Sequence, residues 1–195
     1  GISELPDQQM TAYAVYPAAE SALSGTSVSV NIPASQTYAA DGFSASYPMA
    51  AVTSDGEHFT FSNLATVLSL PLKGDAAIKS ITIEAKGGEG LAGAAAIDFA
   101  DGTPILKAAA EGFASSVTLN CDPAVKLNTE TETVFNFILI PGDYSALKIT
   151  VTDTQTDDMH PNGRTTTKET QAVTLKPGTV KDFGMALGIP YGWNL

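Results

Sequence analysis

The stretch of residues 58–93 constrains the fold more than any other part of the chain. It contains two apolar runs, residues 64–72 and 78–85, and the polar turn Lys73-Gly74-Asp75 separates them. In an extended chain, side chains two positions apart lie on the same face, and leucine and isoleucine recur here at that spacing. The alternation predicts two strands in the middle of a β-sheet. The side chains expected in its core are Phe59, Phe61, Leu68, Leu70, Ile81 and Ile83.

Short alternating runs of this kind recur along the chain, and Gly, Pro, Asn or Asp stands between them. Residues 27–32 and 147–152 alternate strictly between apolar and polar, which is typical of a half-buried strand. Residues 134–140 are almost continuously apolar, so we expect them to be central in their sheet. About ten short strands with little or no helix predict an all-β protein with a two-sheet β-sandwich.

One segment is ambiguous from its pattern, and the partner of another can be assigned from the turn before it. Residues 103–114 contain an alanine-rich run that favours helix, but Pro104 and Gly112 leave barely two turns. We therefore expect a loop there, or a single helical turn at most. Residues 165–175 are expected to pair with residues 147–152, because Asn162-Gly163 suits a tight reversal between them.

The length of 195 residues is enough to bury a substantial core, and no shift of composition marks a linker. We expect a single domain over residues 1–195, with residues 1–9 as a loose lead-in and residues 188–195 as a tail. The one cysteine, Cys121, excludes an intrachain disulfide. It alternates with Val117 and Leu119, so a buried, inert thiol is favoured over a nucleophile or an intermolecular link.

The balance of charge narrows the choice of partners. The formal net charge is −11, from 21 acidic and 10 basic residues, so most of the surface would repel a phosphate backbone. Nucleic acid is therefore not an expected partner. No apolar run approaches the roughly 20 residues that cross a bilayer, so no membrane span is expected. The opening Gly1-Ile2-Ser3-Glu4 leaves room for a leader or a lipid-attachment cysteine upstream.

Metal ligands and catalytic residue types are present, but not in a diagnostic pattern. Asp153, Asp157, Asp158 and His160 form the nearest approach to a metal site. Their spacing lacks both the order of a calcium loop and the His-x-x-x-His pitch of a zinc site, so a solvated hairpin loop is favoured. We expect neither a metal nor a cofactor.

Catalysis by paired carboxylates or by a serine nucleophile is equally poorly supported. Glu57, Glu84 and Glu111 each lie beside a turn or at an outward strand position, whereas glycoside cleavage needs two acids in one cleft. The only other histidine is His58, and no Gly-x-Ser-x-Gly elbow is present. We predict that the protein is not an enzyme.

Aromatic side chains in loops keep a carbohydrate-binding interpretation open. Tyr38, Tyr47, Tyr191 and Trp193 lie in predicted loops or in the tail. Such side chains cover the edges of a sandwich core more often than they stack on a ligand. The residues retained for ligand stacking are Tyr47, Tyr191 and Trp193.

The order of strand and turn segments along the chain resembles that of the fimbrillin-like proteins of Bacteroidetes, which include the type V pilins. The turn motifs that carry the resemblance are Gly88-Glu89-Gly90-Leu91-Ala92-Gly93, Ile140-Pro141-Gly142-Asp143-Tyr144-Ser145 and Leu175-Lys176-Pro177-Gly178. The strand segments that carry it are 13–17, 32–38, 59–63, 68–74 and 78–83. Together these pieces cover most of residues 13–183 and contain no catalytic signature.

The resemblance implies a transthyretin-like β-sandwich, exported as a lipoprotein and displayed at the outer membrane or cell surface. Such a protein would act in cell adhesion as a fimbrial (pilus) subunit or an adhesin. Its partners would be other fimbrial subunits or host surface ligands, joined by β-strand addition. Family pilins generally carry two such domains, and this chain is about one domain long. Related domains also serve glycan use, which makes a carbohydrate-binding module of a surface glycan-utilisation system the alternative function.

Overall fold

The protein is built almost entirely from β-strands, as the computed structural model shows for residues 11–17, 22–24, 26–55, 57–99 and 102–183. Strands make up 59% and helix 1%, so the predicted all-β, sandwich-like fold is confirmed. The predicted lead-in 1–9 and tail 188–195 lie outside the described residues.

Seventeen strands are described, more than the ten or so expected, because several are only two or three residues long. In chain order they are β1 Ala12–Tyr16, β2 Ala22–Ser24, β3 Ser27–Ile32, β4 Ser35–Thr37, β5 Met49–Thr53, β6 Ser62–Asn63, β7 Thr66–Leu72, β8 Ala77–Ala85, β9 Ala92–Asp98, β10 Ile105–Ala114, β11 Ser116–Lys126, β12 Thr133–Leu139, β13 Gly142–Tyr144, β14 Leu147–Asp153, β15 Thr165–Glu169, β16 Val173–Leu175 and β17 Val180–Asp182.

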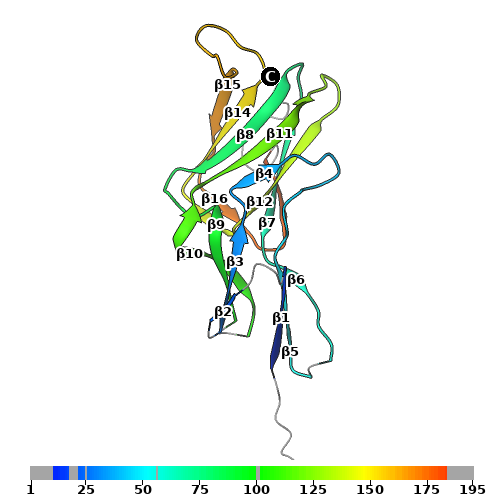
Figure 1. Ribbon diagram of the computed structural model, residues 1–195, viewed down its shortest axis with the longest axis vertical. Helices are drawn as coiled ribbons and strands as arrows, with labels where there is room; N and C mark the ends of the chain where they lie inside the picture. Colours follow the sequence, from blue (N-terminus) through cyan, green and yellow to red (C-terminus); the bar gives the residue numbers. More distant parts are fainter. Residues whose placement is uncertain (1–10, 18–21, 25, 56, 100–101, 184–195) are drawn as a thin grey trace, which may run out of the picture.

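The body of the molecule has two layers. A five-stranded sheet of order β15-β14-β8-β11-β4 lies in front of the three-stranded sheet β12-β7-β17 in Figure 1. Leu68 and Leu70 of β7 and Ile81 and Ile83 of β8 are fully buried in one hydrophobic core, as predicted. The two strands belong to different layers, however, because the connection at Lys73-Gly74-Asp75 carries the chain from one sheet to the other. Each strand is interior to its own sheet.

The strand β12 is not central in its sheet, contrary to prediction. Among the described residues it pairs only with β7. Phe135 and Phe137 on one of its faces are fully covered, whereas Val134 on the other face is 38% exposed. Its other edge meets the buried amide of Gln36 from β4. Gln36 Nε2 donates to the Ile138 carbonyl at 2.8 Å, and the Ile138 N–H donates to Gln36 Oε1 at 3.0 Å. One side chain thus takes the place of a neighbouring strand and ties the two layers together.

Phe59 and Phe61 are not core residues, and this prediction was wrong. Their exposed fractions are 39% and 45%, and they precede the two-residue strand β6 in a loop. The loop begins with a turn in which Asp55 Oδ1 accepts the N–H groups of Glu57 and His58. The phenylalanines alternate with Thr60 and Ser62 as in a strand, but pairing with β5 begins only at Ser62. Residues 59–61 therefore have no neighbouring strand and stay in the loop.

Residues 103–114 contain a strand and not the predicted loop or helical turn. β10 pairs with β9, with Ile105 opposite Asp98 and Ala114 opposite Ala92. A bulge interrupts the ladder between Ala108 and Phe113, where Gly112 adopts a φ of +76°. The local preference of alanine for helix is weak, and the pairing of β10 with β9 overrides it.

The predicted strand over residues 165–175 is two strands. β15 pairs with β14, which confirms the predicted hairpin, but β16 pairs with β13. Thr170 lies between them, and its buried hydroxyl accepts the Leu147 N–H at 2.9 Å. This contact ends the ladder with β14 and redirects the chain.

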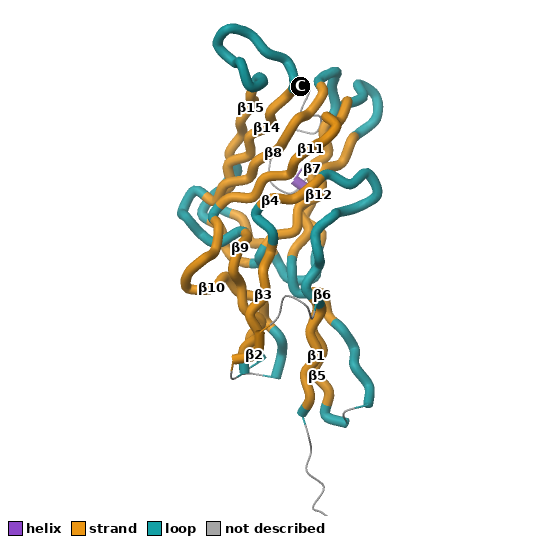
Figure 2. The backbone as a smooth tube through the Cα atoms, in the orientation of Figure 1, coloured by secondary structure: helices purple, strands orange, loops and turns teal. Residues whose placement is uncertain are grey.

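Two arms extend from the body on the side of the molecule away from β15, as Figure 2 shows. One belongs to the four-stranded sheet β10-β9-β3-β2, and the other to the sheet β1-β5-β6. The rings of Tyr13 on β1 and Phe99 after β9 are 4.6 Å apart between centroids. In β3, Val28, Val30 and Ile32 are buried and the residues between them are not, as predicted.

Candidate functional site

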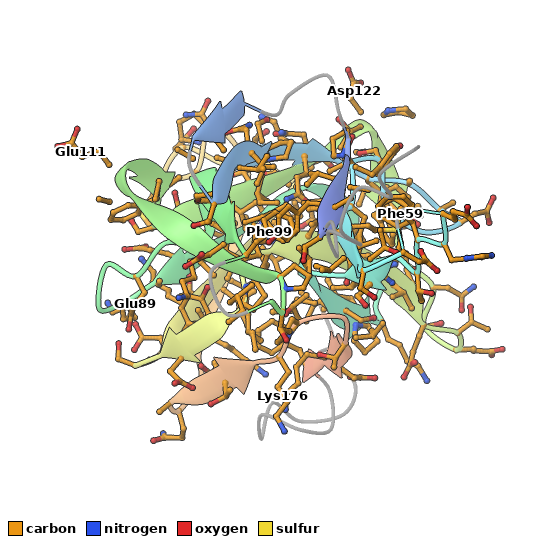
Figure 3. All side chains as sticks on the ribbon, turned by 90° about the horizontal axis from the view of Figure 1, so that it is seen from below. Phe59, Glu89, Phe99, Glu111, Asp122 and Lys176 are labelled. Atoms are coloured by element: carbon orange, nitrogen blue, oxygen red, sulfur yellow. The ribbon has the colours of Figure 1, made fainter. Side chains whose placement is uncertain are left out.

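The strongest candidate site is a groove beside β10, which we call the β10 groove. It has a volume of about 320 Å³ and lies between β10 and the two-stranded ladder of β13 and β16. Its lining residues are Ile105, Leu106, Lys107, Pro141, Gly142, Asp143, Thr174, Leu175, Lys176 and Pro177. Figure 3 labels Lys176 on the side of the molecule opposite Asp122.

Unpaired strand edges flank this groove. β10 is the outer strand of its sheet and pairs with β9 alone, while β13 and β16 pair only with each other among the described residues. Outer strands present N–H and C=O groups to solvent on one side. An extended chain laid in the groove could therefore continue the hydrogen-bonded ladder of β10.

The side chains of the groove suit a strand better than they suit a polar small molecule. Leu106 and Leu175 are buried beneath it, and Ile105 is 41% exposed at its wall. Two of the charged groups at its rim are already engaged: Lys107 Nζ lies 4.0 Å from Asp98 Oδ2, and Asp143 accepts a hydrogen bond from the Thr174 hydroxyl. The third, Lys176, is exposed. Apart from Lys176, the surface left for a partner is apolar, with main-chain polar groups along one side.

Of the residues retained from the sequence for ligand stacking, only Tyr47 is within the described part of the chain. Its ring is half-buried, 5.6 Å from the ring of Phe43, and its hydroxyl donates to the Ala65 carbonyl at 2.6 Å. Tyr191 and Trp193 lie outside the described residues. The stacking role of these three residues stays a prediction. Tyr38 packs against Phe135, with 5.1 Å between ring centroids.

The acidic loop after β14 is organised by hydrogen bonds. Asp157 Oδ1 accepts the N–H groups of Met159 and His160, at 3.0 and 2.8 Å, and also lies 2.8 Å from His160 Nδ1. Arg164 Nε donates to Asp157 Oδ2 at 3.3 Å. The sequence alone did not indicate that Arg164 would bind this carboxylate. In the residues that the structure describes, no three His, Cys, Asp or Glu side chains gather in a metal-binding arrangement.

This arrangement predicts a change at acid pH. The His160 side chain, followed by the backbone N–H groups of His160 and Met159, lowers the pKa of Asp157. A lowered pKa means that the carboxylate stabilises the loop at neutral pH and that this contribution is lost as the pH falls through the lowered value. We expect the amide signals of Met159 and His160 to move together in an NMR titration below about pH 4. Asp157→Asn should abolish this concerted movement, and a titration unchanged by that substitution would contradict the assignment.

The carboxylates considered for catalysis are dispersed over separate elements. Glu84 on β8 lies 3.4 Å from Lys148 Nζ, Glu111 projects from β10, and Glu57 is exposed in the loop before β6. Cys121 is buried, and burial raises the pKa of its thiol to about 11. The thiol is therefore protonated at neutral pH, which agrees with the buried, inert side chain expected from the sequence.

Comparison with known proteins leaves the family open. No family model matches the chain, and no curated protein matches it. A crystal structure of a candidate cell adhesion protein from Bacteroides uniformis is similar at 17% identity, with a TM-score of 0.47. The match covers 80% of this chain and 57% of that one, so the chain spans less than two thirds of that protein's length. Among the residues described here, no helix has the length and apolar character needed to cross a membrane.

Proposed function

We propose that the protein is a non-enzymatic cell-surface protein, fimbrillin-like, that acts in adhesion or fimbrial assembly. Its β10 groove would accept an extended strand from another surface subunit. The observation that carries the proposal is the position of an apolar groove between the unpaired edge of β10 and the β13–β16 ladder. The order of strand and turn segments, which resembles that of fimbrillin-like proteins, supports the same function.

Strand addition is physically suited to this surface. Main-chain hydrogen bonds to the edge of β10 would supply affinity independent of the sequence added. Alternate apolar side chains of the added strand would contact Ile105 and cover Leu106 and Leu175, so the strand's own alternation would set its register. The proposal includes export of the protein to the cell surface, with or without a lipid anchor.

The wall residue Ile105 provides the test. In the producing bacterium, unheated surface extracts should give detergent-resistant, heat-sensitive ladders on immunoblots of this protein. Ile105→Asp places a charge at the apolar wall of the groove, and inward-pointing charges block strand pairing at sheet edges. We expect the variant to reduce the ladders at least tenfold, because about 1.4 kcal/mol of lost affinity is already a factor of ten.

Phe113→Asp is the matched control. Phe113 lies on the same strand with the same exposed fraction of 41%, but outside the lining of the β10 groove. Its variant should keep the ladders. Ladders that survive Ile105→Asp at full strength, or a wild-type protein that forms none, would contradict strand addition in this groove.

A further inference from the structure

A second depression, which we call the Lys79 hollow, lies on the five-stranded sheet. Both neighbours of β8 shift register at this point. β11 pairs Asn120 with Ser80 and then Val125 with Ile78, and β14 pairs Thr152 with Ser80 and then Asp153 with Ile78. Lys79 therefore has no partner in either ladder. Paired irregularities of this kind open the sheet locally and redirect side chains, as β-bulges do beside binding sites.

Most of the side chains that line the hollow are polar. Its volume is about 550 Å³, within the range of roughly 300–1,000 Å³ that small-molecule sites occupy. It is lined by Lys79, Ser80, Asn120, Cys121, Asp122, Ala124 and Thr154. Cys121 is buried, and most of the other lining residues are exposed or half-exposed. In Figure 3, Asp122 lies at the outer margin of the molecule, across from Lys176 of the β10 groove.

Several of its polar groups have hydrogen-bonding capacity to spare. Lys79 Nζ makes one hydrogen bond, to the Asn162 carbonyl at 3.3 Å, and retains further donors. Asn120 Nδ2 donates to Ser35 Oγ and to the Gln36 carbonyl, which leaves its Oδ1 available as an acceptor. Among the described residues, the carboxylate of Asp122 has no hydrogen-bond or ion-pair partner.

This mixture favours a neutral, hydroxyl-rich ligand. One cation and one carboxylate line the hollow, so their charges cancel and give no net attraction for a phosphate or an acidic sugar, and the overall charge of −11 opposes any anion. A sugar hydroxyl can both donate to Asp122 and accept from Lys79, and its neighbours can bond Ser80, Asn120 and Thr154 in the same way. Ala124 and Cys121 offer apolar surface to the C–H groups of the ring.

We propose that the Lys79 hollow binds a neutral mono- or disaccharide unit of a surface glycan. The site is separate from the β10 groove, so the protein has one surface for a strand and another for a sugar. No aromatic side chain lines the hollow, which limits affinity to the weak range and makes multivalent display on a surface the means of retention.

The test is an NMR titration of the isotope-labelled chain with glucose, galactose, mannose, N-acetylglucosamine and lactose. We expect at least one of these sugars to give saturable shifts confined to residues 79–80, 120–124 and 154. Asp122→Asn keeps the size of the side chain but removes the charge-assisted acceptor, and should weaken binding about tenfold. Asp143→Asn, in the β10 groove, is the matched control and should leave sugar binding unchanged.

Three outcomes would overturn the proposal. The first is that no sugar of the panel gives saturable shifts at the hollow. The second is that the shifts persist unchanged in Asp122→Asn. The third is that inorganic phosphate binds the hollow more tightly than every sugar. Because Ile105→Asp leaves the hollow intact, the sugar titration and the assembly assay succeed or fail independently.

Discussion

Replacing Gln36 by leucine is expected to lower the free energy of unfolding by about 2–5 kcal/mol. Gln36 is only 4% exposed, and its amide makes three hydrogen bonds: two with the main chain of Ile138 and one to the Pro33 carbonyl at 3.0 Å. Leucine has a similar size but would leave an N–H and two carbonyl groups without these partners. Each buried group left unsatisfied costs about 1–3 kcal/mol, and the measurement is urea unfolding.

Two further variants make this prediction specific. Gln171→Leu changes an exposed glutamine and should alter stability by less than about 0.5 kcal/mol. Gln36→Glu would place a carboxylate beside the carbonyls of Pro33 and Ile138, and burial should raise its pKa above the value in the unfolded chain. Relative to the wild type, that variant should be least destabilised below about pH 4 and should lose further stability as the pH rises through the raised value. A Gln36→Leu variant as stable as the wild type would show that the two layers do not depend on this side chain.

Replacing Gly93 by alanine is expected to cost about 3 kcal/mol, because strain and a clash coincide at this residue. Gly93 adopts a φ of +81°, a left-handed conformation that L side chains rarely occupy. A Cβ there would lie 2.7 Å from the Gly112 carbonyl oxygen and 2.8 Å from the Ala114 nitrogen. Both atoms belong to the backbone of β10 at its bulge, so they cannot move without disturbing the β9–β10 pairing.

Gly102→Ala separates the two effects. Gly102 has a φ of +72°, but a Cβ there would meet no atom within 4 Å. It should therefore cost only the backbone strain, about 1–2 kcal/mol. The comparison is made by urea unfolding of both variants. Equal losses at the two positions would contradict close packing of β10 on β9 as the cause.

The alternation of apolar and polar residues correctly predicted the strands that have one buried and one exposed face. In β3, in β14 and in β8 from Ser80 onward, apolar and polar side chains alternate, and burial follows that alternation. It failed where a strand's identity depends on a distant partner. β10 is a strand because β9 lies beside it, although its own residues favour helix. Phe59 and Phe61 show the opposite error: their segment alternates as a strand does, but it has no neighbouring strand and stays in a loop.

The position of each strand within its sheet was harder to predict from the sequence than the presence of the strand. Residues 134–140 were expected to be central because they are apolar, but the single side chain of Gln36 covers the edge of β12. The β10 groove could not be predicted, since its lining comes from three separate segments, 105–107, 141–143 and 174–177. The turn residues Pro141-Gly142 and Pro177-Gly178 were the only local signals near it.

The most direct test of strand addition is photo-crosslinking from the groove itself. A benzoylphenylalanine at position 105, introduced in the cells that produce the protein, would lie at the apolar wall of the β10 groove. We predict that irradiation joins it to an extended segment of another surface subunit or of a second copy, identified by mass spectrometry of the joined peptides. The same group at position 113 should not capture that segment. Equal capture from both positions, or none from position 105, would contradict the account.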